Sequence, residues 1–437
     1  MSIDNGVVTR LTVSAWPGVQ PRLLLPAGDT AVDDAAAEDA AAYRDAGGYQ
    51  DLADPGALLE QIDRSGLLGR GGAAFPLAVK LRTVRDAGRD AGGTAVLANG
   101  EEGEPASVKD RWLLRRRPHL VLDGVRLAAR IVNATNAVVY VSDAEAARAL
   151  DAALEAAPMD GLDVRVVTVD AGYVAGEETA AVRAVNGGPA KPTDKPPRPF
   201  EEGISGLPTL VSNVETLANL PFILRNGSDA FRSQGTSASP GTFLATVTGG
   251  GRPAALYELP HGTSVAELLE RHGVSVDHVK GVLMGGYFAG LLNREVLDAT
   301  LDHESMRRLN SGLGCGAVSV LTDDCPVAVA ASVMAYFDRE NAGQCGSCFN
   351  GTAAMAAVTD ALRLGAATAE DLTRLERWSV VLRGRGACAT LDAATNVAAS
   401  LLRAFPTDVA RHLAGGCDDC RRGAYAAQRP YEVEAVS

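Results

Sequence analysis

The stretch Thr94-Ala-Val-Leu-Ala-Asn-Gly-Glu-Glu-Gly-Glu104 decides the fold, because a short apolar run leads directly into an amide and a cluster of carboxylates. Two further runs of β-type residues, Ala137–Val141 and Val164–Val169, also end at polar or acidic residues, and helix-compatible sequence separates the three runs. Strands that alternate with helices predict a three-layer α/β domain with a mainly parallel sheet. Ligands of such sheets bind beyond the carboxyl ends of the strands, so we expect a site formed by residues 99–104 and 170–178.

The composition is that of a globular chain with material for a large core. At roughly 150 residues per domain, 437 residues predict about three domains, and 46% of the residues are apolar. The net charge of −13 argues against general binding of nucleic acid or anionic membranes. No basic region followed by an apolar stretch opens the chain, and Val327–Phe337 is too short to span a bilayer. We therefore expect a cytoplasmic protein without direct membrane insertion.

The sequence changes character after the α/β pattern. Short β-type runs at Phe243–Val247 and Gly281–Met284 flank one helix, Val265–His272, which indicates a small α+β module. The later sequence is helical, and Thr368 with Asp371 predicts a capping box at the start of one helix. The chain is thus expected to contain a poorly defined segment at 1–46, the α/β domain at 47–240, the small module at 241–300, a helical domain at 301–405 and a cysteine-containing tail at 406–437.

Two kinds of loop suggest a ligand site in the α/β domain. The turn Gly69-Arg70-Gly71-Gly72 can present backbone N–H groups to a phosphate that Lys80 neutralises, although a purely structural tight turn explains this pattern equally well. The acidic clusters Glu101-Glu102-Gly-Glu104 and Glu177-Glu178 resemble ordinary solvated surface. Both clusters, however, follow predicted strands at the ligand-binding edge of the sheet, which favours a functional role.

The seven cysteines form an odd number and gather in the last third of the chain. In a reducing compartment this favours metal binding or redox chemistry over a disulfide framework. Cys345-Gly-Ser-Cys348 and Cys417-Asp-Asp-Cys420 are two CxxC pairs, and Cys388 lies between them. Such pairs suit tetrahedral zinc or iron–sulfur ligation. We expect the other two, Cys315 and Cys325, to be small buried hydrophobic residues.

Several sequence blocks, in a fixed order, make the chain similar to a known family. They resemble the flavoprotein, NADH-oxidising subunit of respiratory complex I and the related subunits of bacterial hydrogenases and formate dehydrogenases, over roughly residues 47 to 405. The blocks are Gly47-Gly-Tyr49, Ser65-Gly-Leu-Leu-Gly-Arg-Gly-Gly-Ala-Ala-Phe-Pro76, Asn99-Gly-Glu-Glu-Gly-Glu-Pro105, Lys109-Asp-Arg111, Pro118-His119, Gly172-Tyr-Val-Ala-Gly-Glu-Glu-Thr179, Lys195-Pro-Pro197, Asn213-Val-Glu-Thr216, Ser311-Gly-Leu-Gly314 and Gly343-Gln-Cys345.

The resemblance implies an α/β fold made of a Rossmann-like FMN-binding domain, a small ubiquitin-like β-grasp insertion at 241–300 and a C-terminal helical bundle with an iron–sulfur site. It implies a nicotinamide site at Phe75, Glu104, Glu178 and Lys195, with Glu104 and Glu178 as candidate catalytic residues. Hydride transfer needs the nicotinamide stacked near the flavin, so position and electrostatics matter more than an acid or base. The implied FMN-binding residues are Gly69, Arg70, Gly71, Gly72, Lys80, Asn99, Glu101, Glu102, Tyr173, Gly176, Glu177 and Asn213.

The chain departs from the family's cluster motif, Cys-Gly-x-Cys-x-x-Cys followed by a distant fourth cysteine. Ala342 occupies the first position, which leaves Cys345, Cys348 and Cys388 as the implied ligands of an iron–sulfur cluster. A [4Fe–4S] cluster completed by Glu340, Asn341 or another cysteine, and a [3Fe–4S] cluster held by three thiolates, are both open. So is a tail that folds back, with Cys417 and Cys420 completing the cluster or forming a Cys₄ zinc site with Cys345 and Cys348. A fourth alternative is that no metal binds.

A second departure concerns the nucleotide. Two aromatic positions that enclose the adenine in the family are Thr83 and Arg198 here, and the loss of stacking surface should weaken NADH binding. Arg198 is suited to a 2′-phosphate, because a guanidinium binds phosphate through paired hydrogen bonds. Relaxed specificity, or some preference for NADPH, and an ordinary surface arginine are equally good interpretations of this position.

We therefore predict an FMN-dependent NAD(P)H oxidoreductase. Its cofactors would be FMN, NADH or NADPH, and an iron–sulfur cluster that carries single electrons to a ferredoxin or a thioredoxin-like [2Fe–2S] partner subunit. Two other functions stay open on the sequence alone. One is a non-catalytic scaffold or assembly subunit of the same fold, which the missing cysteine favours. The other is a flavin reductase in which zinc only stabilises the structure and no iron–sulfur cluster carries electrons onward.

Overall fold

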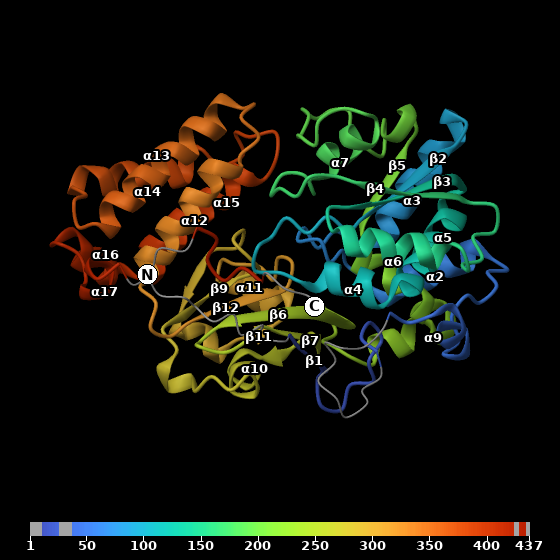
Figure 1. Cartoon of the computed structure of the whole chain (residues 1–437), viewed down its shortest axis with the longest axis horizontal. Coiled ribbons are helices and arrows are strands. Elements are labelled where there is room, and N and C mark those ends of the chain that lie inside the picture. Colours follow the sequence, from blue (N-terminus) through green and yellow to red (C-terminus); the bar gives the residue numbers. More distant parts are fainter. Residues whose placement is uncertain (1–10, 26–36, 424–427, 434–437) are drawn as a thin grey trace.

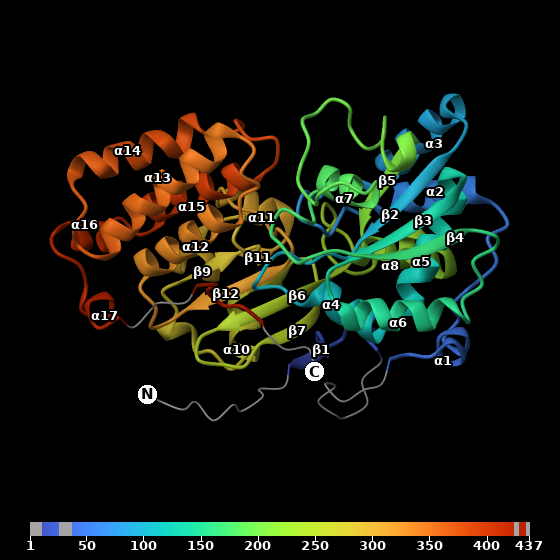
Figure 2. The same ribbon diagram turned by 45° about the horizontal axis from the view of Figure 1, so that its top comes forward.

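The computed structural model describes residues 11–25, 37–423 and 428–433. Three parts are visible in Figures 1 and 2: an α/β domain, a mixed β-sheet beside it and a helical bundle that lies over the mixed sheet. The predicted fold class is confirmed. Of the segment predicted at 1–46, residues 1–10 and 26–36 lie outside the described residues, and the rest contributes one strand and one short helix, β1 (Thr12–Ala15) and α1 (Ala40–Asp45).

The α/β domain is built on a parallel sheet in the order β4-β3-β2-β5. The strands β2 (Thr94–Asn99), β3 (Ala134–Val141) and β4 (Asp163–Thr168) contain or overlap the three predicted runs. The fourth strand, β5 (Thr209–Asn213), was not recognised in the sequence because its run is short and ends in polar residues. Since β2 and β5 are neighbours, the chain leaves the sheet at Asn99 and Asn213 side by side.

Alternating side chains of β2 explain the three layers. Val96 and Ala98 pack into one core with helices such as α5, while Ala95 and Leu97 pack on the other face with residues of α7. A strand buried on both faces needs apolar residues at every position, as this one has. The helices of this domain are α2 (Pro55–Ser65), α3 (Leu77–Ala91), α4 (Lys109–Arg116), α5 (Pro118–Val132), α6 (Ala144–Leu154), α7 (Glu178–Val185), α8 (Val214–Ala218) and α9 (Leu220–Arg232), with the 3₁₀ turn η2 (Ile204–Gly206).

The second part is a mixed sheet in the order β1-β7-β6-β12-β9-β10. Its centre pairs β6 and β12 in parallel, with an antiparallel neighbour on either side, and α10 packs against it as expected of a β-grasp module. Two of its strands, β1 and β12, come from outside the predicted range 241–300. The elements are β6 (Thr242–Gly249), β7 (Ala255–Pro260), β8 (Thr263–Ser264), α10 (Val265–Arg271), η3 (Val276–His278), β9 (Gly281–Met284), β10 (Leu291–Asn293), η4 (Arg294–Asp298), β11 (Thr300–Leu301), α11 (His303–Arg308) and β12 (Ala317–Leu321).

The third part is helical, as predicted. A largely apolar core fills it and includes Val327, Phe337 and Leu401. The capping box of Thr368 and Asp371 is present at the start of α14. The helices are α12 (Pro326–Glu340), α13 (Gly346–Arg363), α14 (Ala369–Val381), α15 (Thr390–Ala404), α16 (Pro406–Leu413) and α17 (Asp418–Arg421).

A buried carboxylate attaches the N-terminal segment to the mixed sheet. Glu258 on β7 accepts hydrogen bonds from the backbone N–H groups of Arg22, Leu23 and Leu24 at 3.0 to 3.1 Å and from the Thr242 hydroxyl at 2.8 Å. Every one of these partners donates to Glu258. A group with only acceptors is therefore required at this position.

We expect Glu258→Gln to lower the free energy of unfolding by about 2 to 4 kcal/mol, because the amide NH₂ would face buried N–H donors. Urea denaturation of the full chain measures the loss. The matched control is Glu270→Gln, an exposed carboxylate on α10 of the same part, which should change stability by less than about 0.5 kcal/mol. Equal effects of the two substitutions would contradict the assignment.

Candidate functional site

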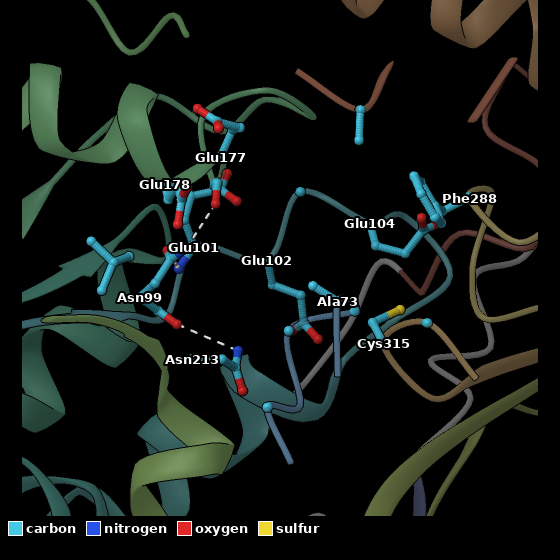
Figure 3. Close-up of a pocket in the computed structure, with 18 of the residues that line it drawn as sticks. Ala73, Asn99, Glu101, Glu102, Glu104, Glu177, Glu178, Asn213, Phe288 and Cys315 are labelled. Carbon is cyan, nitrogen blue, oxygen red and sulfur yellow. Dashed lines mark hydrogen bonds between the residues drawn. The ribbon is translucent and has the colours of Figure 1, made fainter. Parts of the chain in front are cut away.

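A cavity of about 440 Å³ lies at the carboxyl ends of β2 and β5, within the usual range for ligand sites. Its wall combines the glycine-rich loop before α3, the loop after β2 and the segment before α7. The mixed sheet and the bundle supply the opposite wall, which includes Phe288, Cys315 and Cys388. Figure 3 shows Glu101, Glu177 and Glu178 on one side of the open space, and Glu104 on the other side with Phe288 and Cys315.

The glycine-rich loop lines the cavity through its backbone. Gly69 N–H donates to the Phe75 carbonyl at 2.9 Å, which closes the loop. Gly72 has φ +111°, a conformation that L side chains rarely adopt, and a Cβ on Gly71 would come within 3.2 Å of Asn213 Cβ. The side chain of Arg70 is not among the lining groups. It is buried behind the loop, where Nη2 donates to the Thr242 carbonyl at 3.0 Å.

Two lysines stand at the rim near α7. Lys80 lines the cavity, its Nζ donates to the Val211 carbonyl at 2.8 Å and lies 3.9 Å from Glu178 Oε2, and burial lowers its pKa. Lys195 does not line the cavity. Its Nζ lies 2.5 Å from Glu177 Oε1 and 3.7 Å from Glu178 Oε1. The predicted residues Glu177, Glu178, Lys80 and Lys195 are thus one network of charges.

Three of the predicted polar residues also end or begin secondary structure. Glu102 accepts from the N–H groups of Asp110 and Arg111, at 3.2 and 3.0 Å, in the first turn of α4. Glu177 accepts from Thr179 N–H at 2.8 Å at the start of α7, and Asn213 accepts from Glu215 N–H at 3.0 Å at the start of α8. These side chains are held rigidly at the cavity because helix N-termini attract acceptor groups.

Glu101 and Glu104 differ from the other carboxylates of the cavity. Glu101 accepts from Gly172 N–H at 3.2 Å and Glu104 from Tyr287 N–H at 2.9 Å. In the described part of the chain, Glu101 Oε2 and Glu104 Oε1 are buried without a hydrogen-bond partner. Burial raises the pKa of Glu101 to about 7 and that of Glu104 to about 8. Unpartnered oxygens and raised pKa values are typical of groups that bind a ligand.

The remaining predicted residues also lie in the wall. Asn99 Nδ2 donates to the Gly176 carbonyl at 2.7 Å, which joins the end of β2 to the segment before α7. Tyr173 packs edge-on against Tyr336 of the bundle, with ring centroids 5.7 Å apart. Phe75 is 49% exposed at the rim, which leaves an aromatic face open to a ligand.

Of the two positions that replace family aromatics, Thr83 is half-buried and Arg198 is exposed. The Thr83 hydroxyl donates to the Val79 carbonyl within α3. The backbone N–H of Arg198 donates to Glu201 Oε2, and its side chain faces solvent.

The sequence analysis missed a buried ionic cluster beneath the cavity. Lys109, 1% exposed, has its Nζ 2.7 Å from Asp110 Oδ1 and 2.9 Å from Glu215 Oε2. Burial opposes the charged form of Lys109, but Asp110 and Glu215 raise its pKa. Asp110 also lines the cavity and accepts from Asn213 Nδ2 at 2.7 Å. The sequence showed Lys109 and Glu215 only as parts of family blocks, because their pairing spans more than a hundred residues.

The three implied cluster cysteines come together at one end of the bundle. Cys345 precedes α13 and its Sγ accepts from Ala387 N–H at 3.4 Å, while Cys348 lies in the first turn of α13. Burial, together with the neighbouring Cys388 and Cys345, raises the pKa of Cys348 to about 12. Cys388 Sγ lies 3.3 Å from the Thr390 hydroxyl. Three thiols thus converge, which fits an iron–sulfur cluster with three cysteine ligands.

Polar groups at and beside the position of the missing ligand already have hydrogen-bond partners in the protein. The Ala342 carbonyl accepts from Lys191 Nζ at 2.9 Å. Asn341 Oδ1, one of the oxygen ligands left open, accepts from Gly343 N–H at 3.0 Å. In the described ranges no fourth thiol of the α13 region replaces the absent cysteine.

Among the alternatives left open for the cluster, the one in which the tail folds back is wrong. Cys417 and Cys420 do not fold back onto Cys345 and Cys348 but lie beside Cys325. This excludes both a Cys₄ zinc site made of the two CxxC pairs and an iron–sulfur cluster completed by a tail cysteine. Cys325 is buried as predicted, yet it belongs to this polar group and not to a purely apolar contact. The reason is that α16 packs against α12 and carries the tail to the start of that helix. Cys315 is half-buried and lines the cavity.

The cavity is large enough for a nucleotide, and Cys388 of the three converging cysteines lies in its wall, which suits hydride transfer followed by the transfer of single electrons. Fold and site therefore define a flavin- and iron–sulfur-dependent nicotinamide nucleotide oxidoreductase. Residues 62–222 match the Nuo51 FMN-binding domain, and residues 328–412 match the NADH-ubiquinone oxidoreductase-F iron-sulfur binding region. The chain belongs to the family of NADH-quinone oxidoreductase F subunits.

Individual relatives agree with this assignment. The chain is 33% identical over 396 residues to the F 2 subunit of the NADH-quinone oxidoreductase of Rhizobium meliloti (strain 1021), which covers 85% of this chain and 93% of that protein. It is 32% identical over 390 residues to the NADP-reducing hydrogenase subunit HndC of Solidesulfovibrio fructosivorans, covering 84% and 79% of the two chains.

Solved structures show the same fold. A chain of the NAD⁺-reducing [NiFe]-hydrogenase in the air-oxidized state gives a TM-score of 0.76 at 30% identity, over 87% of this chain and 68% of that chain. The H₂-reduced state gives a TM-score of 0.74 at 31% identity, over 83% and 63%. The chain thus spans less than two thirds of the length of this second structure. None of the helices in the described ranges is both long and apolar enough to cross a membrane.

The raised pKa of Glu104 predicts a pH-dependent stability. Folding favours the protonated carboxyl, so the wild-type free energy of unfolding falls as the pH rises from the ordinary value of 4.5 to about 8. We expect Glu104→Gln to stabilise the ligand-free chain by about 2 kcal/mol near pH 8.5 and to change little near pH 4.5. Urea denaturation at the two pH values measures the difference.

The control for this measurement is Glu155→Gln, an exposed carboxylate of the same domain. It should show no pH-dependent gain. A gain for Glu104→Gln that is the same at both pH values, or larger at the lower one, would show that the carboxyl is charged and well solvated in the folded protein.

Proposed function

We propose that this protein oxidises NADH at an FMN bound in the cavity and passes the electrons singly to an iron–sulfur cluster held by Cys345, Cys348 and Cys388. One observation carries the proposal: Cys388 and its neighbour Thr390 line the same cavity as the glycine-rich loop. A flavin in that cavity would therefore lie next to the cluster. When bound, FMN accepts a hydride and releases electrons one at a time.

In this proposal the glycine-rich loop and Lys80 hold the FMN phosphate. Backbone N–H groups of such a loop suit an anion, and among the described residues lining the cavity Lys80 is the one cation. Arg70 acts indirectly, because its buried guanidinium fixes the loop to β6. Asn99, Glu101, Tyr173, Gly176 and the other implied flavin residues surround the remaining volume.

The nicotinamide nucleotide would enter between Phe75 and Glu104. Phe75 offers an exposed aromatic face for stacking. Burial keeps Glu104 largely protonated near neutral pH, so its Oε1 can donate a hydrogen bond to a ligand carbonyl. Glu178, held by Lys80 and Lys195, would contact the ribose hydroxyls. Phe75, Glu104 and Glu178 then position the two reacting rings, which is what hydride transfer requires.

The cluster would be a [3Fe–4S] cluster, or a [4Fe–4S] cluster with one ligand that is not cysteine. Both follow from three converging thiols and the absence of a cysteine at Ala342. The relatives named above are subunits of larger assemblies. We further propose a ferredoxin or thioredoxin-like [2Fe–2S] subunit as the electron acceptor and a cytoplasmic location.

Cofactor analysis of the full chain, purified anaerobically, tests the proposal. We expect about one FMN and about three or four iron atoms with matching sulfide per chain. Lys80→Met should weaken FMN binding on the order of tenfold or more through loss of a charge-assisted contact, and should leave the iron in place. Cys345→Ser should lose iron and keep FMN.

The matched control is Lys280→Met, which removes an exposed lysine of the mixed sheet whose Nζ binds the Asp323 carbonyl. It should retain both cofactors. FMN without iron in the wild-type protein would favour a flavin reductase. A chain that holds neither group after reconstitution would contradict the proposal and favour a scaffold.

A further inference from the structure

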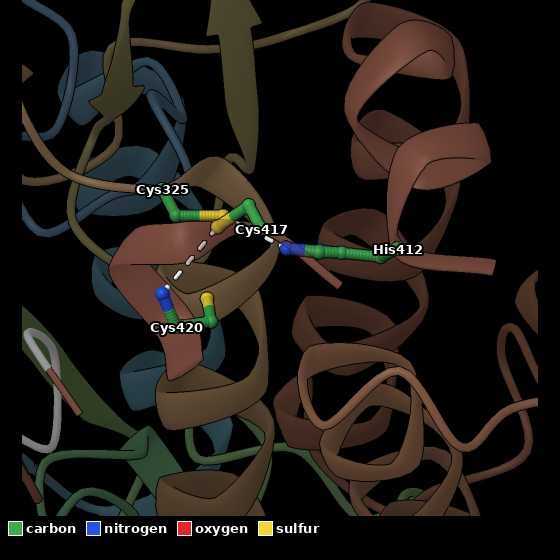
Figure 4. A group of neighbouring side chains, drawn as sticks. All are labelled: Cys325, His412, Cys417 and Cys420. Carbon is green, nitrogen blue, oxygen red and sulfur yellow. Dashed lines mark hydrogen bonds between the residues drawn. The ribbon is translucent and has the colours of Figure 1, made fainter. Parts of the chain in front are cut away.

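A second group of side chains that could bind a metal lies outside the lining of the cavity. Cys325, His412, Cys417 and Cys420 each place one ligand atom so that all four atoms lie within 4.8 Å of one another. Figure 4 shows the four side chains converging from α12, α16 and the turn at α17. None of the four is more than 9% exposed, and His412 is fully buried. The roles proposed for FMN, NADH and the iron–sulfur cluster use none of them.

The spacing of the ligand atoms fits a single metal ion. Tetrahedral zinc has Zn–S bonds of about 2.3 Å and Zn–N bonds of about 2.0 Å, which separate the ligand atoms by about 3.5 to 3.8 Å. Cys325 Sγ and His412 Nε2 lie 3.4 Å apart. A four-iron cluster spreads its ligands over four metal atoms and needs a wider arrangement. Three cysteines and one histidine are a common set for structural zinc.

The backbone around the four side chains positions them as in a metal site. Cys417 precedes α17 and Cys420 lies within it, and Cys420 N–H points at Cys417 Sγ at 3.4 Å. Such a contact stabilises a thiolate. Cys325 precedes α12, and its side chain meets the imidazole from the last turn of α16. Ligands more than 80 residues apart in sequence are thus brought together by the packing of these helices.

We propose that Cys325, His412, Cys417 and Cys420 bind a structural zinc ion that fastens the C-terminal tail to the start of α12. The site is distinct from the iron–sulfur cluster, and it does not depend on the proposed function. All four positions of the ion would be filled by protein, as in structural rather than catalytic zinc sites.

The tail that the ion would fasten also contacts the segment that follows Glu104. Tyr431 donates through its hydroxyl to Asp324 Oδ2 at 2.7 Å, next to Cys325. Val433 N–H then donates to the Pro105 carbonyl at 3.0 Å, and Arg111 donates to the Val433 carbonyl at 3.0 Å. Pro105 follows Glu104 directly. A fixed tail would therefore support the loop that carries a candidate nicotinamide-binding residue.

Metal analysis of the full chain tests this inference. Purified without added zinc, the wild-type protein should contain about one zinc per chain in addition to any cluster iron. The double variant Cys417→Ser/Cys420→Ser should contain less than about a tenth of that amount, because two of four ligands are lost. Cys345→Ser is the matched control, which should lose iron and keep zinc. This pair separates failure of the zinc site from failure of the proposed cluster.

X-ray absorption at the zinc edge of the wild-type protein keeps the test valid if the double variant does not fold. Three sulfur atoms at about 2.3 Å and one nitrogen atom at about 2.0 Å would support the site. A wild-type chain without zinc, a disulfide between two of the three cysteines, or zinc that disappears in Cys345→Ser would each overturn it.

Discussion

The buried carboxylate of Glu215 is the group on which the arrangement of the site depends. It lies 2.9 Å from Lys109 Nζ and 4.0 Å from Arg70 Nε, and it accepts from Leu244 N–H at 3.0 Å. These partners belong to α4, to the glycine-rich loop and to the mixed sheet, so one anion joins three parts that surround the cavity. A buried carboxylate is unfavourable unless it is paired, which ties the position of each part to the others.

The electrostatics of the cavity explain how an acidic chain can receive a phosphate-bearing ligand. Among the residues that the structure describes, six carboxylates line it: Glu101, Glu102, Glu104, Asp110, Glu177 and Glu178. Glu102 and Glu177 face helix N-termini, and Asp110 faces Lys109. The raised pKa values of Glu101 and Glu104 keep part of their charge neutralised near pH 7. The negative charge near a bound anion is therefore smaller than the composition indicates. Lys80 has less carboxylate repulsion to offset when it binds a phosphate.

Local sequence patterns predicted local structure, but they did not predict strand pairs or side-chain contacts between residues that are distant in the sequence. The strands β2, β3 and β4 of the parallel sheet and the capping box at Thr368 depend on neighbouring residues, so their sequence was sufficient, whereas β5 was missed. The pairing of β1 with β7 spans 243 residues, from Thr12 to Ala255, and that of β12 with β6 spans 71, from Thr246 to Ala317, which no local pattern reports. The resemblance to a family located the cavity residues, but it did not reveal that the Arg70 side chain is buried behind the loop. It also gave no sign of the partners of Cys325, because the tail lies beyond the similar region.

The central claim is that NADH, flavin and cluster form one electron path through the wall that contains Cys388. An anaerobic titration of the reconstituted chain with NADH, followed by visible and EPR spectra, tests it most directly. FMN takes two electrons and the cluster one, so the account predicts an end point near 1.5 NADH per chain, with the cluster signal changing in step with the flavin. An end point near one NADH, with a cluster that responds only to a strong chemical reductant, would contradict the account.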